Sequence, residues 1–355
     1  MQLYNKMSAD QRREWIKAAA KQRVTLSFYQ YHQIQNPGLF RDKLFLDWNK
    51  LHVLGRTYVA REGINAQLSL PSENMEAFIA KLDEIIFLQG VRLNIAIEQD
   101  DMSFLKLKVK VRDKIVADGL DDETFDVTNK GVHLDAQSFN NIIEEEDTIL
   151  VDMRNHYESE VGHFNGAITP DVDTFRESLP IIEDQLADFK EDKKLVMYCT
   201  GGIRCEKASA YFKHKGFKNV FQLEGGIIEY TRRAMEAGIE NKFIGKNFVF
   251  DERRAERISD DVISACHQCG TSCDEHTNCA NASCHLLFIQ CPECAEHLDQ
   301  SCSEACKKIV QLPFEEQKAL RKGKEAGKEQ FSKGRSSVLK FKSVSDRPIQ
   351  VSKNE

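Results

Sequence analysis

Long hydrophobic segments are absent from this sequence of 355 residues. No apolar run approaches the length that spans a bilayer, and residues 1–23 lack the apolar core of a secretory signal. These residues instead predict an amphipathic helix in which Ser8 and Gln11 suit a capping box. The two absences argue against a membrane protein and against export, so we expect a cytoplasmic protein with no membrane partner.

Two cofactor signatures are absent as well. The sequence has no glycine-rich fingerprint for a flavin or nicotinamide nucleotide, and no obvious set of two histidines and one carboxylate that would hold iron. Cysteine, in contrast, is abundant, with 11 residues. In a protein that is not exported, this number argues against a disulfide framework and for metal or redox chemistry.

Acidic residues outnumber basic ones, and the formal net charge is −7, yet the end of the chain is basic. Residues 318–353 contain eleven Lys and Arg against three acidic residues. Their composition predicts a tail, residues 313–355, that is disordered in isolation. A basic tail on an acidic body fits a polyanionic partner such as RNA; a merely solubilising tail is the alternative.

The most informative segment surrounds Cys199. The apolar run LVMY (residues 195–198) predicts a strand that ends at this cysteine, a glycine-rich loop closes on Arg204, and a helical stretch follows. Loop N–H groups, a helix N-terminus and a fixed positive charge all favour thiolate over thiol and cradle an anion. We therefore predict that Cys199 and Arg204 are catalytic. Cys205 is either a resolving thiol or a packing residue.

The loop from Cys199 to Arg204 has six residues and is similar to the active-site loop of rhodanese domains, which carry sulfur as a persulfide. The segments 149–170 and 220–230 resemble the first and last strands of that family. Residues 131–236 are therefore expected to form a rhodanese-like α/β domain with a parallel sheet. Four polar residues near the first strand are expected to hold loops rather than act in catalysis: Asp152, Arg154, Glu158 and His163.

Residues 24–116 predict a separate α+β domain. Their strands and helices follow the order βαββαβ, which is the ferredoxin-like (acylphosphatase-like) arrangement. A polar cluster that includes Arg61 and Asn65 lies between two of the strands, either as a satisfied turn or as a loop that faces substrate. The acidic, turn-rich residues 117–130 are expected to link this domain to the next.

Nine cysteines gather in residues 266–306, within a connector and cysteine-rich region that spans 237–312. Two Cys-x-x-Cys pairs in about forty residues predict structural zinc, with two ions in closed thiolate shells; an iron–sulfur cluster is the alternative. Spacing does not fix the pairing; our hypothesis is two interleaved sites, with Cys266 and Cys269 in one and with Cys291 and Cys294 in opposite or shared roles. The candidate ligands are Cys266, Cys269, Cys273, Cys279, Cys284, Cys291, Cys294, Cys302 and Cys306.

The order of these parts resembles the bacterial rhodanese-like tRNA uridine hydroxylases, from about Val24 to about Cys306. The resemblance implies conversion of the wobble uridine of tRNA to 5-hydroxyuridine, with O2 as co-substrate, the anticodon loop as partner and an unidentified electron donor. Unaided, the residues favour a sulfurtransferase that delivers persulfide sulfur, and a non-catalytic zinc- and RNA-binding scaffold is a third hypothesis. Contacts with substrate are expected from Thr200, Gly201, Gly202, Ile203, Arg61 and Asn65.

Under the hydroxylase hypothesis, the Cys199 thiolate adds to C6 of the uracil ring and leaves an enolate at C5 that reacts with oxygen. Arg204 and the loop N–H groups would stabilise the thiolate and the developing negative charge. A persulfide on Cys199 as the reactive species is the alternative.

Overall fold

The computed structural model describes residues 8–121, 124–322 and 336–341. The chain divides into two compact units. The first contains residues 1–149, 185–241 and 249–256, and the second contains residues 150–184, 242–248 and 257–355. Most of the predicted basic tail lies outside the described residues. No helix in the described ranges is long and apolar enough to cross a membrane.

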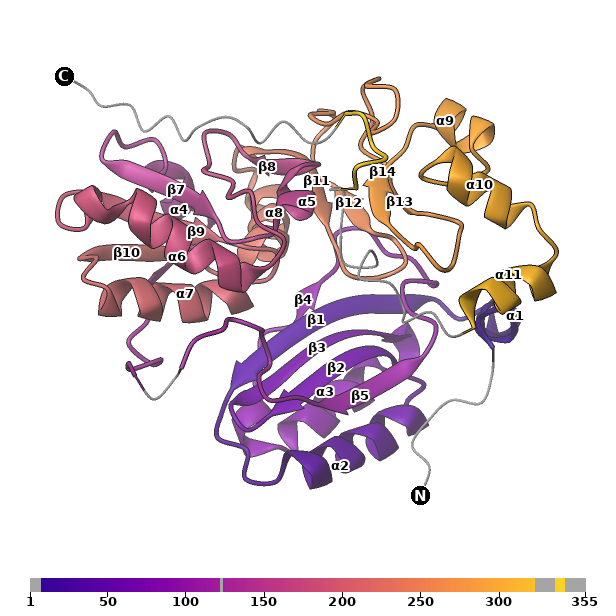
Figure 1. The fold of residues 1–355 in the computed structure, drawn as a ribbon. Helices are drawn as coiled ribbons and strands as arrows, with labels where there is room; N and C mark the ends of the chain where they lie inside the picture. Colours follow the sequence, from indigo (N-terminus) through magenta and orange to yellow (C-terminus); the bar gives the residue numbers. More distant parts are fainter. Residues whose placement is uncertain (1–7, 122–123, 323–335, 342–355) are drawn as a thin grey trace. The chain divides into compact units, whose positions relative to one another are not determined.

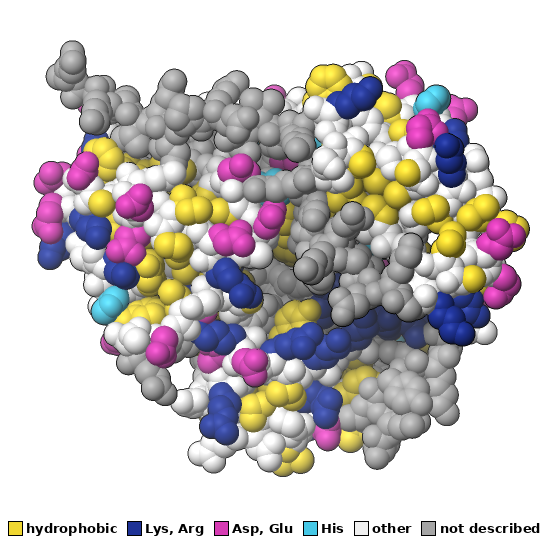
Figure 2. All heavy atoms as spheres, in the orientation of Figure 1, with side chains coloured by type: hydrophobic (Ala, Val, Ile, Leu, Met, Phe, Trp, Pro, Cys, Tyr) yellow, Lys and Arg dark blue, Asp and Glu magenta, His cyan; other side chains and the backbone are white. Residues whose placement is uncertain are grey.

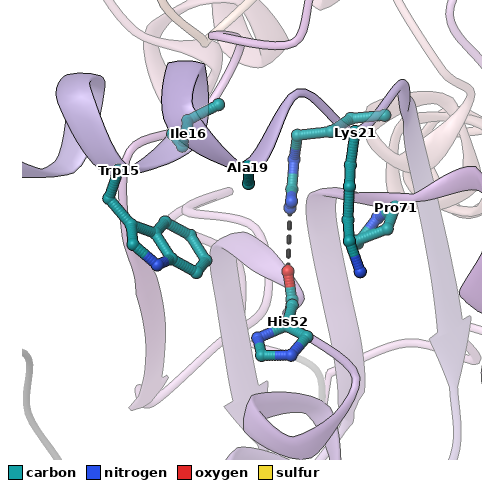
Figure 3. Close-up of a pocket in the computed structure, with 7 residues that line it drawn as sticks. Trp15, Ile16, Ala19, Lys21, His52 and Pro71 are labelled. Carbon is teal, nitrogen blue, oxygen red and sulfur yellow. Dashed lines mark hydrogen bonds between the residues drawn. The ribbon is translucent and has the colours of Figure 1, made fainter.

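The first unit begins with α1 (Ala9–Ala19), whose predicted capping box is confirmed by reciprocal hydrogen bonds between Ser8 and Gln11. Ile16 of this helix is buried in a small cluster with Leu54 and Phe104. Figure 3 shows Trp15 and Ala19 on the side of the helix toward His52, and the Trp15 and His52 ring centroids are 6.0 Å apart. The His52 carbonyl oxygen accepts a hydrogen bond of 2.8 Å from the Arg23 guanidinium. The helix is thus fixed to one end of the neighbouring sheet.

A five-stranded sheet in the order β4-β1-β3-β2-β5 follows (Figure 1). Pairing is antiparallel except between β2 and β5, which are parallel. The predicted βαββαβ order is present, and β5 is added at the edge beside β2. The elements are β1 (Arg23–Tyr31), α2 (Pro37–Lys50), β2 (Leu54–Ala60), β3 (Gly63–Pro71), η1 (Ser72–Asn74), α3 (Met75–Asp83), η2 (Ile86–Leu88), β4 (Asn94–Ile95) and β5 (Leu107–Val111).

Alternation along these strands separates an apolar face from a polar one. Leu26 and Phe28 of β1 point into a core that α2 and α3 cover. Trp48 of α2 is 1% exposed and meets the Phe28 ring edge-on, with centroids 6.3 Å apart. The intervening residues of β1, Ser27 and Tyr29, therefore point to the opposite face of the sheet, which α2 and α3 do not cover.

The first unit also contains three parallel strands in the order β6-β10-β9, as predicted for the rhodanese-like segment. Asn140 of α4 and Tyr230 of α8 are hydrogen-bonded at 2.8 Å, which ties two helices of this unit together. The elements are β6 (Val132–Leu134), α4 (Ala136–Ile142), η3 (Ala187–Phe189), β9 (Lys194–Tyr198), α7 (Ile203–His214), β10 (Asn219–Leu223) and α8 (Gly226–Ala237).

The second unit contains an antiparallel pair, β8 and β11, and the cysteine-rich region with the short antiparallel pair β13 and β14. Strands β7 and β12 and helix α6 each straddle the boundary between the units. The elements are β7 (Thr148–Asp152), α5 (His156–Ser159), β8 (Gly162–Phe164), α6 (Phe175–Gln185), β11 (Phe243–Phe248), β12 (Ala255–Arg257), β13 (His276–Asn278), β14 (Leu287–Ile289), α9 (Pro292–His297), α10 (Glu304–Val310) and α11 (Phe314–Arg321).

The polar residues near β7 form closed local contacts within the second unit. Arg154 and Asp152 are both fully buried and form an ion pair at 2.6 Å. Glu158 accepts a hydrogen bond of 3.0 Å from the Asn155 N–H, and the His163 ring contacts the Ser159 carbonyl oxygen at 3.0 Å. These contacts fit the structural role expected for the four residues.

Candidate active site and candidate metal centres

The Cys199 loop connects the end of β9 to the first turn of α7, as the sequence predicts. Cys199 is fully buried, and the Gly202 N–H donates to its Sγ at 3.1 Å. Gly202 has a φ of +95°, a conformation that disfavours other residues. Arg204 is 8% exposed, and its Nη2 donates to Thr200 Oγ1 at 3.3 Å. The loop therefore surrounds the sulfur with N–H donors and one guanidinium.

The electrostatics of the loop favour the thiolate. Burial acts to raise the pKa of Cys199, but the hydrogen bond from Cys205, the charge of Arg204 and nearby backbone N–H groups outweigh it and lower the pKa to about 6. Burial and the adjacent Cys199 raise the pKa of Cys205 well above its ordinary value. At neutral pH the pair therefore holds one thiolate and one thiol donor. Both alternatives for Cys205, packing and resolving, remain compatible with this arrangement.

A second glycine-rich turn packs directly against the loop. The Ile227 N–H donates to the Cys199 carbonyl oxygen at 3.0 Å. At Gly226, whose φ is +66°, a Cβ atom would lie 2.4 Å from that carbonyl oxygen and 2.7 Å from the Gly201 nitrogen. The turn at the start of α8 therefore needs glycine at position 226, because the backbone of the Cys199 loop lies too close for a side chain.

The face of the N-terminal sheet that α2 and α3 do not cover contacts the first turn of α7, directly after the same loop and within the first unit. The Tyr29 hydroxyl donates to Glu206 at 3.1 Å, and the Tyr31 hydroxyl donates to the Ile203 carbonyl oxygen at 3.4 Å. A Cβ atom on Gly202 would lie 2.9 Å from the Tyr29 hydroxyl. The two tyrosines were not predicted as site residues, although their alternation with apolar residues in β1 places them on one face.

The predicted Arg61 lies in the turn between β2 and β3, whereas Asn65 lies in β3, opposite Tyr58 and Tyr29. Asn65 donates to the Ile115 carbonyl oxygen at 3.1 Å. Glu62 forms an ion pair of 2.8 Å with Lys207 of α7, which is almost fully buried. Arg61 is exposed. Asn65 thus has a structural partner in this geometry, and Glu62 is the residue that connects the turn to the helix after Cys199.

The polar face of the sheet is basic at its β5 edge. Strand register places Lys108 beside Arg56 and Lys110 beside Tyr58, while Lys106 lies two residues before Lys108 on the same face. Burial, together with the charges of Lys106, Arg56 and Lys110, lowers the pKa of Lys108 to about 8. Figure 2 shows Lys and Arg side chains gathered in a band over the region in which Figure 1 draws this sheet.

Eight of the nine clustered cysteines form two groups of four, and within each group the sulfur atoms lie within 4.8 Å of one another. In the first group, the Sγ atoms of Cys269 and Cys291 are 3.6 Å apart. In the second, the Cys284 and Cys302 sulfurs are 3.7 Å apart. A tetrahedral zinc ion with thiolate ligands requires a separation of about 3.8 Å. The groups are Cys266, Cys269, Cys291 and Cys294, and Cys279, Cys284, Cys302 and Cys306.

This geometry selects one of the two predicted alternatives for the pairing and leaves out one candidate ligand. Both Cys-x-x-Cys pairs lie in one group, so they share a site rather than holding opposite roles. Cys273 belongs to neither group; it is 7% exposed, and burial raises the pKa of its thiol. The reason is topological: the β13–β14 hairpin between the two pairs carries Cys279 and Cys284 to a separate point, where Cys302 and Cys306, which follow the second pair, join them.

Three family models match the chain: the UPF0176 acylphosphatase like domain over residues 23–115, the Rhodanese-like domain over residues 135–233, and Rhodanase C-terminal over residues 244–307. These matches agree with the predicted fold classes of the first two regions.

Curated relatives match almost the whole chain. A tRNA uridine(34) hydroxylase from Photorhabdus laumondii is 56% identical over 334 residues, covering 94% of this chain and 95% of the relative. A protein of the same name from Cronobacter sakazakii is 54% identical with the same coverage. A solved rhodanese-like domain protein from Staphylococcus aureus is 22% identical, with a TM-score of 0.24 over 28% of this chain and 90% of that one. The chain belongs to the tRNA uridine(34) hydroxylase family.

Proposed function

We propose that this protein hydroxylates C5 of the wobble uridine in tRNA and that Cys199 is its nucleophile. The observation that carries the proposal is the buried Cys199 thiol, whose pKa is lowered to about 6 by Cys205, Arg204 and backbone N–H groups against the effect of burial. A thiolate of this kind is nucleophilic at neutral pH. Membership of the family supplies the substrate class.

The reaction can be written with its atoms and electrons balanced. The Cys199 thiolate adds to C6 of the uracil ring, and the resulting C5 enolate takes up O2 and a proton to give a C5 hydroperoxide. A two-electron donor and two protons reduce the hydroperoxide to a C5 hydroxyl group and water. Loss of the C5 proton then expels the thiolate and restores the double bond. Arg204 and the loop N–H groups stabilise the negative charge that develops beside them.

The basic edge of the N-terminal sheet supports tRNA as the partner, with its anticodon loop directed to the Cys199 loop. Arg56, Lys106, Lys108 and Lys110 share one face of the sheet, and no carboxylate pairs with them among the described residues. Phosphate contacts dominate affinity for nucleic acids. The same face continues through strand register to Tyr29, which contacts the loop helix.

Sulfur transfer is the second candidate function, because the six-residue loop with its cradled thiolate also fits a persulfide. The two functions predict different adducts. Hydroxylation predicts a covalent complex between the protein and an anticodon stem–loop that carries 5-fluorouridine at the wobble position, since fluorine at C5 blocks release of the C6 adduct. Sulfur transfer predicts a persulfide on Cys199 after treatment with thiosulfate.

The experiment incubates wild type, Cys199→Ser and the matched control Cys273→Ser with the 5-fluorouridine RNA and scores the adduct by denaturing gel and peptide mass spectrometry. Hydroxylation through C6 predicts an adduct at Cys199 in wild type and in the control. Cys273 is a good control because it is also a buried cysteine but lies outside both metal groups. Absence of any adduct, with thiosulfate-derived persulfide on Cys199, would favour the second function.

The two cysteine groups are proposed to hold one zinc ion each, with a structural role. Their ligands are four thiols each, which fits zinc in a closed shell with no open position for substrate. Bound zinc would stabilise the fold of the second unit, since thiolate ligation is coupled to folding.

A further inference from the structure

A small cavity of about 50 Å³ lies beside the Cys199 loop, entirely within the first unit. It is lined by residues of β1 and β4, by Thr200 of the loop, by Ile228 of α8 and by the segment 249–256. Its volume has room for a few water-sized groups, or for the edge of one ring. The cavity is thus formed jointly by the acylphosphatase-like sheet and the rhodanese-like loop.

Two buried oxygen atoms that line this cavity have no hydrogen-bond partner. Asn94 is 3% exposed, and its Oδ1 has none. Glu256 is fully buried, and while its Oε1 accepts from the Ile97 N–H at 2.9 Å and from Arg253 at 2.6 Å, its Oε2 has none. An unsatisfied buried polar atom costs about 1–3 kcal/mol. Inside a cavity, a donor from a ligand or from water can satisfy such an atom.

The lining of the cavity combines apolar and polar side chains. Phe104 and Ile228 supply apolar walls and are each at most 7% exposed. The one cation of the lining, Arg253, is already paired with Asp251 and Glu256. Apolar walls with polar atoms at one side suit a heteroaromatic ring, whose faces are apolar and whose edge carries donors and acceptors.

Asn94 also touches the catalytic loop itself. Its Nδ2 donates to the Gly201 carbonyl oxygen at 3.4 Å, and a Cβ atom on Gly201 would lie 3.3 Å from the same nitrogen. Gly201 is two residues after Cys199, and the next residue, Gly202, donates to the Cys199 sulfur. A group that binds Asn94 is therefore held next to the loop that carries the thiolate.

We propose that this cavity receives the base-pairing edge of the target uracil, with Asn94 Oδ1 accepting the uracil N3–H. This assignment rests on the proposed function and adds to it the residue that selects uridine. Cytosine has no hydrogen at N3, so its lone pair would face the Asn94 oxygen and leave both atoms unsatisfied. Asn94 is thus a specificity-determining residue, and its side chain discriminates uridine from cytidine.

Glu256 contributes a second acceptor to the same cavity. Its Oε1 is held by the Ile97 N–H at 2.9 Å and by Arg253 at 2.6 Å, which fixes the carboxylate and leaves Oε2 without a partner. Acceptor oxygens in this place favour a base edge that carries an N–H donor, as N3 of uracil does.

The test measures binding of three anticodon stem–loop RNAs that differ only at the wobble base, which is uridine, 3-methyluridine or cytidine. Fluorescence anisotropy gives each Kd for full-length protein. Wild type is expected to bind the uridine RNA about tenfold or more tightly than the other two, because each of these lacks the N3–H donor. Asn94→Ala is expected to bind all three alike, with affinities close to that of wild type for cytidine RNA.

Two further variants separate recognition from folding. Asn94→Asp keeps an acceptor oxygen and is expected to retain a preference for uridine over cytidine. Asn74→Ala, which removes an amide that donates to the Leu51 carbonyl oxygen, is expected to keep the wild-type preference. Equal binding of the three RNAs by a wild-type protein that hydroxylates uridine would overturn the role of Asn94 and leave the proposed function intact. A uridine preference in a wild-type protein that does not hydroxylate uridine would overturn the proposed function and leave the role of Asn94 intact.

Discussion

The acidity of Cys199 gives the sharpest quantitative prediction, and Cys205 is the residue with which to test it. The pKa of Cys199 lies at about 6 against an ordinary value of 9.0. This difference of three pH units corresponds to about 4 kcal/mol in favour of the thiolate. The hydrogen bond from Cys205 is the largest favourable contribution. A hydrogen bond to a charged group contributes about 1.5–3 kcal/mol, which is roughly one to two pH units.

Cys205→Ala removes that donor and is expected to raise the midpoint of Cys199 ionisation by about one to two pH units. Cys205→Ser keeps a donor of similar position and is expected to shift it much less. Because Cys199 is fully buried, the assay is the ultraviolet absorbance of the thiolate during a pH titration, with Cys199→Ala as the blank. The absorbance appears as pH rises through the pKa, since the thiolate is the deprotonated form.

The same ionisation predicts how enzyme activity falls on the acidic side of its pH profile. Activity that requires the Cys199 thiolate falls as pH drops below about 6 in wild type, and at a higher pH in Cys205→Ala. An ionisation midpoint that is identical in Cys205→Ala and wild type would refute the assigned source of the low pKa. A midpoint near 9 in wild type would refute the thiolate itself.

Other changes have equally definite outcomes. Cys306→Ser is expected to lower bound zinc from two ions to one per chain by elemental analysis, whereas Cys273→Ser keeps two. Trp48→Ala removes a core side chain of α2 and is expected to lower the free energy of unfolding by about 3–5 kcal/mol, measured by chemical denaturation. Lys207→Met removes a buried ammonium group that pairs with half-buried Glu62 and fully buried Asp118, and is expected to lower the free energy of unfolding by a similar amount, about 3–5 kcal/mol, part of which Glu62→Gln in the same chain recovers. Unchanged stability in Lys207→Met would show that the ion pair holds nothing in place.

Much of the architecture follows from local sequence signals. The strand that ends at Cys199 and the glycine turn after it are determined within a few residues, so both are predicted correctly. The capping box at Ser8 is local in the same way. The α2 and α3 helices and the alternating strands follow from hydrophobic periodicity.

Long-range features could not be predicted in this way. Asn94 belongs to a strand of only two residues, and nothing near it in sequence indicates that its amide touches Gly201. The ion pair between buried Lys207 and half-buried Glu62 joins residues more than a hundred positions apart. The grouping of eight cysteines into two sites, with Cys273 excluded, depends on how the chain folds back through β13 and β14. Spacing alone carries no information on such contacts.

The most direct test of the central claim is nucleoside mass spectrometry of tRNA from cells that lack this gene, complemented with wild type or with Cys199→Ala. The account predicts that 5-hydroxyuridine and nucleosides derived from it are restored by wild type and remain absent with Cys199→Ala. Restoration by both proteins would contradict the role of Cys199. Loss of thiolated nucleosides with normal 5-hydroxyuridine would instead identify the protein as a sulfurtransferase.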